Sequence, residues 1–337
     1  MFVKYILLVV LIIVNIDRQI NSQTTCQTVL DLIILLDGSG SIGSAPFAQA
    51  KSAMVDLVNR LNVGPQKVHV SILRYASTVE DSYVFNKVGS NQMKDQIVRV
   101  INNLQYNGGG TATGEAIQRA RNVCDSACRN QEELVPRAVV LFTDGQSNDP
   151  NLVRIQSEFL RENTKAVVFA VGIGSGINNA ELQLSASTPY SKYVLHLQNY
   201  LQLTQVINQI TLVACNVPAF NEPGVVYKNE VDKDTYRFYR TNIKGLRSGL
   251  GGFMEIAVNI TQGNVQVFTS TTEANPTSDN SKRAVVQSHD AKSTTDIYME
   301  YLPPDTQIFY SSFKGMANAN QYTFVSRVVD INGAAIG

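Results

Sequence analysis

The chain has 337 residues, of which 44% are hydrophobic, and its 28 basic residues balance 28 acidic ones to a formal net charge of zero. At ~150 residues per domain this length predicts two domains, and the hydrophobic content is enough for ordinary cores. A neutral chain as a whole has no electrostatic attraction to nucleic acid or to an anionic membrane. We therefore expect a globular protein that binds no nucleic acid.

Residues 1–22 have the pattern of a secretory signal peptide. Lys4 precedes ten uncharged and almost wholly apolar residues, 5–14, and the polar stretch NIDRQINSQ follows, with a plausible cleavage point near Ser22. A membrane-spanning helix needs ~20 apolar residues, so an uncleaved anchor is the weaker alternative. No second apolar run of that length follows in the sequence. We expect a soluble, secreted, extracellular protein with no transmembrane segment in its mature chain.

The four cysteines and one glycosylation motif fit an extracellular chain. Cys26, Cys124, Cys128 and Cys215 permit three pairings, and we favour Cys26–Cys215 and Cys124–Cys128 over unpaired buried thiols. The N-I-T motif at Asn259 is the single acceptor for N-glycosylation. A zinc site is disfavoured because the chain has no C-x-x-C spacing and its three histidines are scattered.

Residues 26–215 are predicted to form one α/β domain, because apolar runs alternate with amphipathic segments. The runs are short, β-branched and mostly apolar on both faces, as in parallel strands covered by helices; they lie at 29–37, 67–76, 137–145, 165–174 and 192–198. Apolar residues recur at helical spacing in segments 46–61, 90–104, 113–124, 151–163 and 200–213. This order predicts a doubly wound, mostly parallel, Rossmann-like sheet, which binds ligands at the carboxyl ends of its strands.

The remaining sequence predicts a second, all-β domain. Residues 216–231 contain two prolines and are predicted to be a linker. Residues 232–332 hold seven short strand-like runs separated by turn residues, with no convincing helix, which favours a β-sandwich. The runs lie at 236–243, 253–261, 264–271, 283–289, 295–302, 306–313 and 322–331.

Oxygen-bearing side chains gather where strands of the first domain end. In the stretch LLDGSGSIG, Asp37, Ser39 and Ser41 occupy alternate positions, and Gly38 and Gly40 are expected to let the loop curl. Two further loops supply oxygen: Thr111 follows three glycines at a helix start, and Asp144 ends an apolar strand; Thr113 is an alternative to Thr111. Such hard donors suit Mg²⁺, or else Mn²⁺ or Ca²⁺. The competing interpretation is that the two serines only cap the helix entered at Pro46.

These motifs, in this order on an α/β pattern, resemble the von Willebrand factor type A domain. The resemblance covers residues 29–215 and implies a metal-ion-dependent adhesion site at Asp37, Ser39, Ser41, Thr111 and Asp144. It implies that the two serine hydroxyls bind the ion directly. It also implies that Thr111 enters or leaves the first coordination shell, and that the two aspartates act largely through waters.

The function implied is that of a secreted, non-enzymatic adhesion or matrix protein. With few anions bound directly, the ion stays a Lewis acid and leaves a position open for a partner's acidic side chain. The alternatives are a non-catalytic scaffold or accessory subunit of an extracellular enzyme or channel-processing complex, and a host-interaction or defence factor. The second domain loosely resembles the β-sandwich accessory domain found after some secreted peptidases, which implies binding without catalysis.

Overall fold

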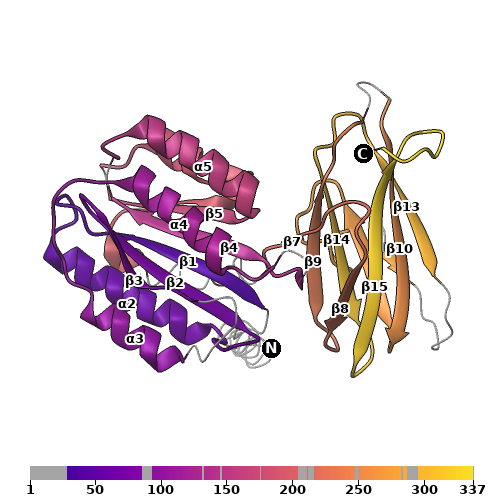
Figure 1. Cartoon of the computed structure of the whole chain (residues 1–337), viewed down its shortest axis with the longest axis horizontal. Helices are drawn as coiled ribbons and strands as arrows, with labels where there is room; N and C mark the ends of the chain where they lie inside the picture. Colours follow the sequence, from indigo (N-terminus) through magenta and orange to yellow (C-terminus); the bar gives the residue numbers. More distant parts are fainter. Residues whose placement is uncertain are drawn as a thin grey trace, which may run out of the picture.

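The computed structural model of the chain describes residues 29–85, 93–130, 133–144, 146–174, 176–203, 211, 216–246, 250–281, 284–286 and 295–336. The predicted signal peptide, Cys26 and Cys215 lie outside these residues, so the predicted Cys26–Cys215 disulfide does too. Figure 1 shows an α/β region joined to a region built from antiparallel strands. No helix of the described part of the chain is long and apolar enough to cross a membrane.

A six-stranded sheet forms the centre of the α/β region, in the order β3-β2-β1-β4-β5-β6. Its strands are β1 (Leu30–Asp37), β2 (Val68–Tyr75), β3 (Val79–Tyr83), β4 (Arg137–Thr143), β5 (Val167–Ile173) and β6 (Val194–Leu197). All neighbours pair in parallel except β2 and β3. The five apolar runs thus form the five parallel strands as predicted. Strand β3, an antiparallel edge strand that is exposed at its acidic centre, is not predicted by the apolar runs of the sequence.

Helices cover both faces of this sheet, as Figure 1 shows. They are α2 (Ser44–Arg60), α3 (Lys94–Asn103), α4 (Thr113–Ala127), α5 (Pro150–Thr164), α6 (Asn179–Ser185), α7 (Tyr190–Tyr193) and the 3-10 turn η2 (Tyr200–Gln202). Alternate residues of the buried strands point to opposite faces. Leu32, Ile34 and Leu36 pack with α2 and α3, whereas Ile33 and Leu35 pack with α4 and α5. The α/β prediction is therefore confirmed.

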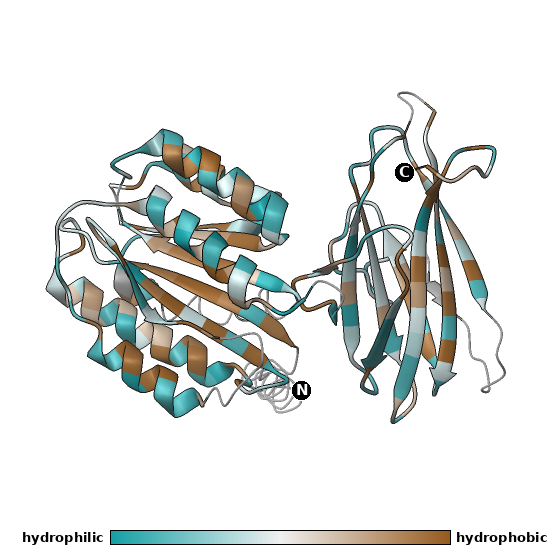
Figure 2. Cartoon of the chain, in the orientation of Figure 1, coloured by the Kyte–Doolittle hydropathy of each residue, from teal (hydrophilic) through white to brown (hydrophobic). Residues whose placement is uncertain are grey.

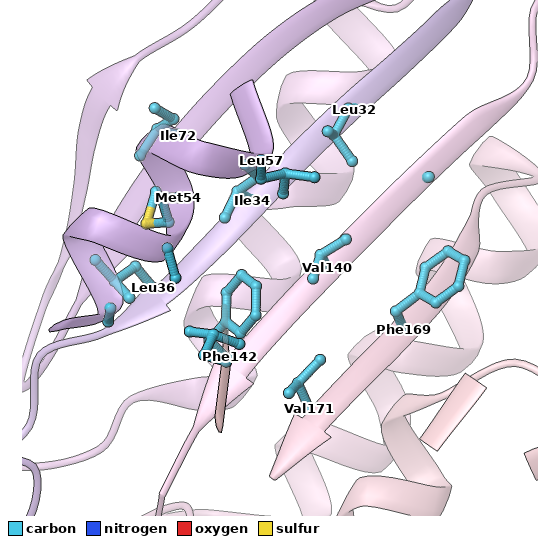
Figure 3. Packing of buried hydrophobic residues seen from close by; sticks show 14 of the residues in the cluster. Leu32, Ile34, Leu36, Met54, Leu57, Ile72, Val140, Phe142, Phe169 and Val171 are labelled. Atoms are coloured by element: carbon cyan, nitrogen blue, oxygen red, sulfur yellow. The ribbon is translucent and has the colours of Figure 1, made fainter. Parts of the chain in front are cut away.

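The packing beneath α2 shows why the strands are apolar along their whole length. Met54 and Leu57 of α2 lie over the side chains of Leu36 and Ile72, and Phe142 continues the same layer (Figure 3). In Figure 2 the central strands are mostly brown, whereas the helices alternate brown and teal, as expected for helices with one face in solvent. A disulfide joins Cys124 to Cys128 at the end of α4, as predicted.

Two packed antiparallel sheets form the second region. One has the order β13-β10-β15-β8 and the other β12-β11-β14-β9-β7. Their strands are β7 (Ala219–Phe220), β8 (Tyr227–Val231), β9 (Tyr236–Asn242), β10 (Gly252–Gln262), β11 (Val265–Ser270), β12 (Ala284–Val286), β13 (Asp296–Leu302), β14 (Ile308–Gly315) and β15 (Asn320–Val329). Aromatic side chains fill the core between the sheets, where the Tyr239 and Tyr322 hydroxyls lie 2.8 Å apart.

All seven strand-like runs of this region form strands. The stretch predicted as a linker, 216–231, differs from the expectation because it contains β7 and β8. The short strand β8 pairs with β15, and β7 pairs in parallel with β9. Pro218 and Pro223 interrupt the stretch outside these pairings, which is where a sheet tolerates proline.

Candidate metal centre

Asp37 ends β1 at the carboxyl edge of the sheet and is completely buried. Its Oδ1 accepts a hydrogen bond from the backbone N–H of Ser39 at 2.8 Å, and its Oδ2 accepts one from the Thr143 hydroxyl at 2.8 Å. Thr143 is the last residue of β4, which pairs with β1. The loop after β1 and the neighbouring strand β4 therefore hold the carboxylate in place through neutral donors.

The two serines connect Asp37 to Asp144. The Ser39 and Ser41 hydroxyl oxygens are 3.2 Å apart, and the Ser41 hydroxyl donates to Asp144 Oδ1 at 2.8 Å. Ser39 is buried, Asp144 is half-buried and Ser41 is exposed. The oxygen atoms therefore form a row that begins inside the sheet and ends at the surface.

Thr111 lies on a third loop, which is joined to the other two through the backbone. Gly40 N donates to Gly109 O at 2.8 Å, and Asn148 N donates to Thr111 O at 3.0 Å. The Thr111 hydroxyl has no hydrogen-bond partner among the described residues, and the residue is 7% exposed. Thr113, the alternative, is the first residue of α4 and its hydroxyl is buried. The loop contacts favour Thr111 as the ligand, which stays a prediction.

The glycines of these loops allow close approach of the backbones. A Cβ added to Gly40 would meet Gly109 O at 3.2 Å, and one added to Gly38 would meet the Phe47 ring at 3.3 Å. Gly109 has φ of +95°, and a Cβ there would lie 2.5 Å from Ser77 Oγ. Left-handed backbone is therefore needed at Gly109, whereas Gly38 and Gly40 are needed for space, a reason that differs from the expected curl.

Burial opposes the negative charges of this site. It raises the pKa of Asp37 from 3.8 to about 6, although the bonds from Ser39 and Thr143 act in the opposite direction. Burial likewise raises the pKa of Asp144 above its ordinary value, against the hydrogen bond from Ser41. Each carboxylate would be stabilised by a cation placed between them.

The donor set fits a hard divalent ion. It consists of hydroxyl and carboxylate oxygens, which Mg²⁺, Mn²⁺ and Ca²⁺ prefer. No group of three or more His, Cys, Asp and Glu side chains gathers anywhere in the described part of the chain, so a ligand set based on those side chains has no support there. The helix-cap interpretation is wrong, because α2 begins after Gly43 and receives no side-chain cap. The serines are therefore available to a ligand.

Several supporting residues were missed by the sequence analysis. Thr143 and Asn148 lie beside Asp144 in the sequence, and their polar side chains near a site residue were a usable signal. Glu181 of α6 carried no such signal, because it is far away in the chain. Its carboxylate accepts from Ser147 N at 3.0 Å, and the Ser147 hydroxyl donates to Thr111 O at 3.3 Å. Burial raises the pKa of Glu181, against the hydrogen bond from Ser147.

A doubly wound α/β sheet with a hydroxyl and carboxylate cluster at its carboxyl edge defines the class of this protein. Residues 31–209 match the family model of the von Willebrand factor type A domain. The chain belongs to this family, as the resemblance of its motifs predicted.

Relatives of the chain include proteins of the extracellular matrix. Over 185 residues it is 34% identical to the collagen alpha-1(XXI) chain of Xenopus laevis, which covers 55% of this chain and 18% of the collagen. It is 27% identical to matrilin-2 of Mus musculus, over 56% of this chain and 19% of the matrilin. The match thus spans less than a fifth of either relative.

A solved structure of similar fold is that of a thread matrix protein from the mussel byssus. Proximal thread matrix protein 1 of the mussel byssus, with a zinc-occupied metal-ion-dependent adhesion site (MIDAS), aligns with a TM-score of 0.50 and 25% identity. The alignment covers 57% of this chain and 47% of that one.

Proposed function

We propose that this protein is a secreted adhesion or matrix protein whose type A domain binds a protein partner through a divalent metal ion. The observation that carries the proposal is the chain of hydrogen bonds that runs from the Asp37 carboxylate, through the backbone N–H of Ser39 and the Ser39 and Ser41 hydroxyls, to Asp144. Matrix proteins among its relatives support the setting. No catalytic role is part of the proposal.

The residues present divide into holding and supporting groups. Ser39, Ser41 and Thr111 would hold the ion through their hydroxyls, and Asp37 and Asp144 would orient its waters and balance its charge. When bound, the ion supplies a Lewis acid for a carboxylate. Mg²⁺ is our first choice, with Mn²⁺ and Ca²⁺ as substitutes of the same hard class.

The exposure of the residues favours one direction of approach for a partner. Asp37 and Ser39 close the inner side of the site, whereas Ser41 is exposed and Asp144 half-buried. A partner's Asp or Glu side chain can therefore reach the ion from solvent on the side of Ser41. The surrounding loops, which contain Gly108–Gly110 and Ser147–Asp149, would contact the rest of the partner.

Secretion and glycosylation belong to the same proposal. The signal-peptide pattern of residues 1–22 and the Cys124–Cys128 disulfide support an oxidising compartment. Asn259 follows the buried Val258 on β10, where buried and partly exposed residues alternate, so its side chain belongs to the outer face of the sheet. A glycan there would extend into solvent.

Calorimetry of the secreted chain tests the metal site directly. Titration with Mg²⁺ and with Mn²⁺ should give a saturable heat for the wild type that is lost in Asp37→Asn. Asp81→Asn is the matched control, because it removes an exposed carboxylate from the same sheet. Equal heats for the wild type and Asp37→Asn would contradict the metal site.

Adhesion needs its own measurement. Immobilised matrix from the source tissue should retain the wild-type chain in Mg²⁺ and release it when a chelator is added. Asp37→Asn should show little retention in either buffer, and Asp81→Asn should behave like the wild type. Retention that a chelator leaves unchanged would contradict metal-dependent adhesion, even where calorimetry shows that the chain binds the metal.

A further inference from the structure

A pocket lies where the α/β region meets the β-sandwich, far from the metal centre. Its volume is about 170 Å³. The α/β region lines it with Arg161, Ser187 and Tyr193, and the sandwich lines it with Arg240 and Tyr310. Two positive charges therefore face one small space from two different regions.

Arg240 of β9 has an incompletely satisfied guanidinium. One of its terminal nitrogens donates to Lys165 O across the junction, whereas its Nε is buried and has no hydrogen-bond partner among the described residues. No carboxylate of the described residues forms an ion pair with it. Burial lowers the pKa of Arg240, which shows how unfavourable the charge is in this place. An unpaired buried charge is costly unless an opposite charge lies beside it.

Arg161 of α5 is anchored at the end of α6 and forms no ion pair with a carboxylate of the described residues. Its Nη1 donates to the carbonyl oxygens of Leu184 and Ser185, at 2.9 and 2.8 Å, at the end of α6. Glu158 and Glu162, on the same helix, raise the pKa of Arg161 but form no ion pair with it, and burial lowers that pKa by more. The arginine is thus held in a defined position beside the pocket.

The other lining residues supply no negative charge. None of the described residues that line the pocket is acidic, and the rest of the lining is tyrosine, serine, threonine and apolar. Tyr310 lies next to Arg240, because these two residues pair across β14 and β9. Burial raises the pKa of Tyr193 to about 12, so this phenol is neutral near pH 7 and offers a hydrogen-bond donor.

We propose that this pocket binds a small oxyanion, such as sulfate, phosphate or a free carboxylate, between Arg161 and Arg240. The anion supplies the negative charge that neither guanidinium finds in an ion pair among the described residues, and oxyanions bind arginine through charge-assisted hydrogen bonds. The small volume suits a free ion with a few waters.

Such an anion would also fix the two regions relative to each other. The direct polar contacts across the junction include Arg240 with Lys165 O and Lys192 Nζ with Asn275 Oδ1, at 2.9 Å. An oxyanion bridging Arg161 and Arg240 adds a link that exists only when it is bound. The position of the metal centre relative to the sandwich would then depend on the anion.

Titration of the full chain with sodium sulfate, in chloride buffer of matched ionic strength, tests the proposal. The wild type should bind sulfate saturably, and Arg240→Gln should bind it ~10- to 100-fold more weakly, because charge-assisted hydrogen bonds are lost. Arg327→Gln is the matched control, since it removes a positive charge from the exposed outer side of the sandwich. Arg240→Lys keeps the charge and should retain weaker, measurable binding.

Thermal unfolding by circular dichroism gives an independent readout. Sulfate stabilises most proteins by exclusion from their surface, so the informative quantity is the difference between variants. Sulfate should raise the melting temperature of the wild type and Arg327→Gln more than that of Arg240→Gln. In chloride alone, Arg240→Gln should melt no lower than the wild type, because it carries no uncompensated charge.

Two results would overturn the proposal. One is an equal sulfate response of the wild type and Arg240→Gln in both measurements. The other is binding of a heparin oligosaccharide that requires Arg240 while inorganic sulfate and phosphate have no effect, which would assign the site to a polysaccharide. Loss of metal binding in Asp37→Asn is unaffected by either result, so the two proposals fail separately.

Discussion

Strand β1 carries an aspartate near each end, and the two carboxylates have very different hydrogen-bond partners. Asp31 and Asp37 are both completely buried. Asp31 receives three hydrogen bonds from Arg129, from its backbone N–H at 2.7 Å and its guanidinium at 2.6 and 2.9 Å, and His69 lies 3.5 Å away. Among the described residues, Asp37 receives hydrogen bonds from the neutral donors Ser39 and Thr143 alone.

This difference separates a structural carboxylate from a ligand-binding one. The charge of Asp31 is balanced inside the fold, at the end of the sheet opposite to the metal centre. Asp37 forms no ion pair with Lys, Arg or His among the described residues, and burial raises its pKa to about 6. A buried carboxylate without an internal cation is stabilised by a cation from outside.

The largest effect is expected from Asp31→Asn. The substitution leaves the Arg129 guanidinium buried without its countercharge, which should lower the free energy of unfolding by about 3–5 kcal/mol. Urea unfolding in the presence of a chelator measures it, with the helical circular dichroism as signal, because every described helix lies in the α/β region.

Asp37→Asn is the control on the same strand, with the same substitution at the same burial. In metal-free buffer this substitution should leave the free energy of unfolding unchanged or raise it, because the neutral side chain removes a charge that burial opposes. Equal losses for the two variants would show that internal pairing does not distinguish the two ends of β1.

An intermediate effect is expected from pH on metal affinity. The pKa of Asp37 is about 6, so below this pH protons compete with the metal for its carboxylate. The apparent affinity for Mg²⁺ should therefore fall ~tenfold per pH unit. Burial also raises the pKa of Asp144, so its protonation should add to the loss of affinity as the pH falls further. Calorimetric titrations above and below pH 6 measure it.

The stability of the metal-free protein should change in the opposite direction. Between pH 3.8 and about pH 6, the folded state keeps a proton on Asp37 that the unfolded state has lost. The contribution of this group to the free energy of unfolding therefore rises as the pH falls. The contribution is lost as the pH rises through about 6. A metal affinity that is constant across this range would show that Asp37 does not act on the metal site.

The ends of β1 also show what could be predicted from the sequence. Asp37 was identified because Ser39 and Ser41 follow it at alternate positions, and because strand ends of a doubly wound sheet meet at one edge. Asp31 stands within an apolar run and has no polar motif beside it. Its partner Arg129 lies 98 residues away, so nothing local signals the pair.

Other features escaped prediction for related reasons. Strand β3 is polar and exposed, and its pairing with β2 comes from tertiary context that outweighs β-propensity. The strand β7 is too short to show a pattern of its own, and it is defined by its parallel pairing with β9. The pocket between Arg161 and Arg240 joins two regions, and no periodicity along the chain reports such a contact. Sequence patterns predict what one element buries, not which elements meet.

The smallest effect is expected from Asp81→Asn on β3. Asp81 accepts from Arg119 Nε at 2.8 Å, but the two side chains are 38% and 41% exposed. Solvent and salt screen an exposed pair, so its loss should lower the free energy of unfolding by less than about 1 kcal/mol. The same urea titration measures it, and high salt should remove the remaining difference from the wild type. If Asp81→Asn lowered the free energy of unfolding as much as Asp31→Asn, a cationic partner would stabilise the fold whether or not the pair is buried. A small decrease would show that such a partner stabilises the fold only where water is excluded.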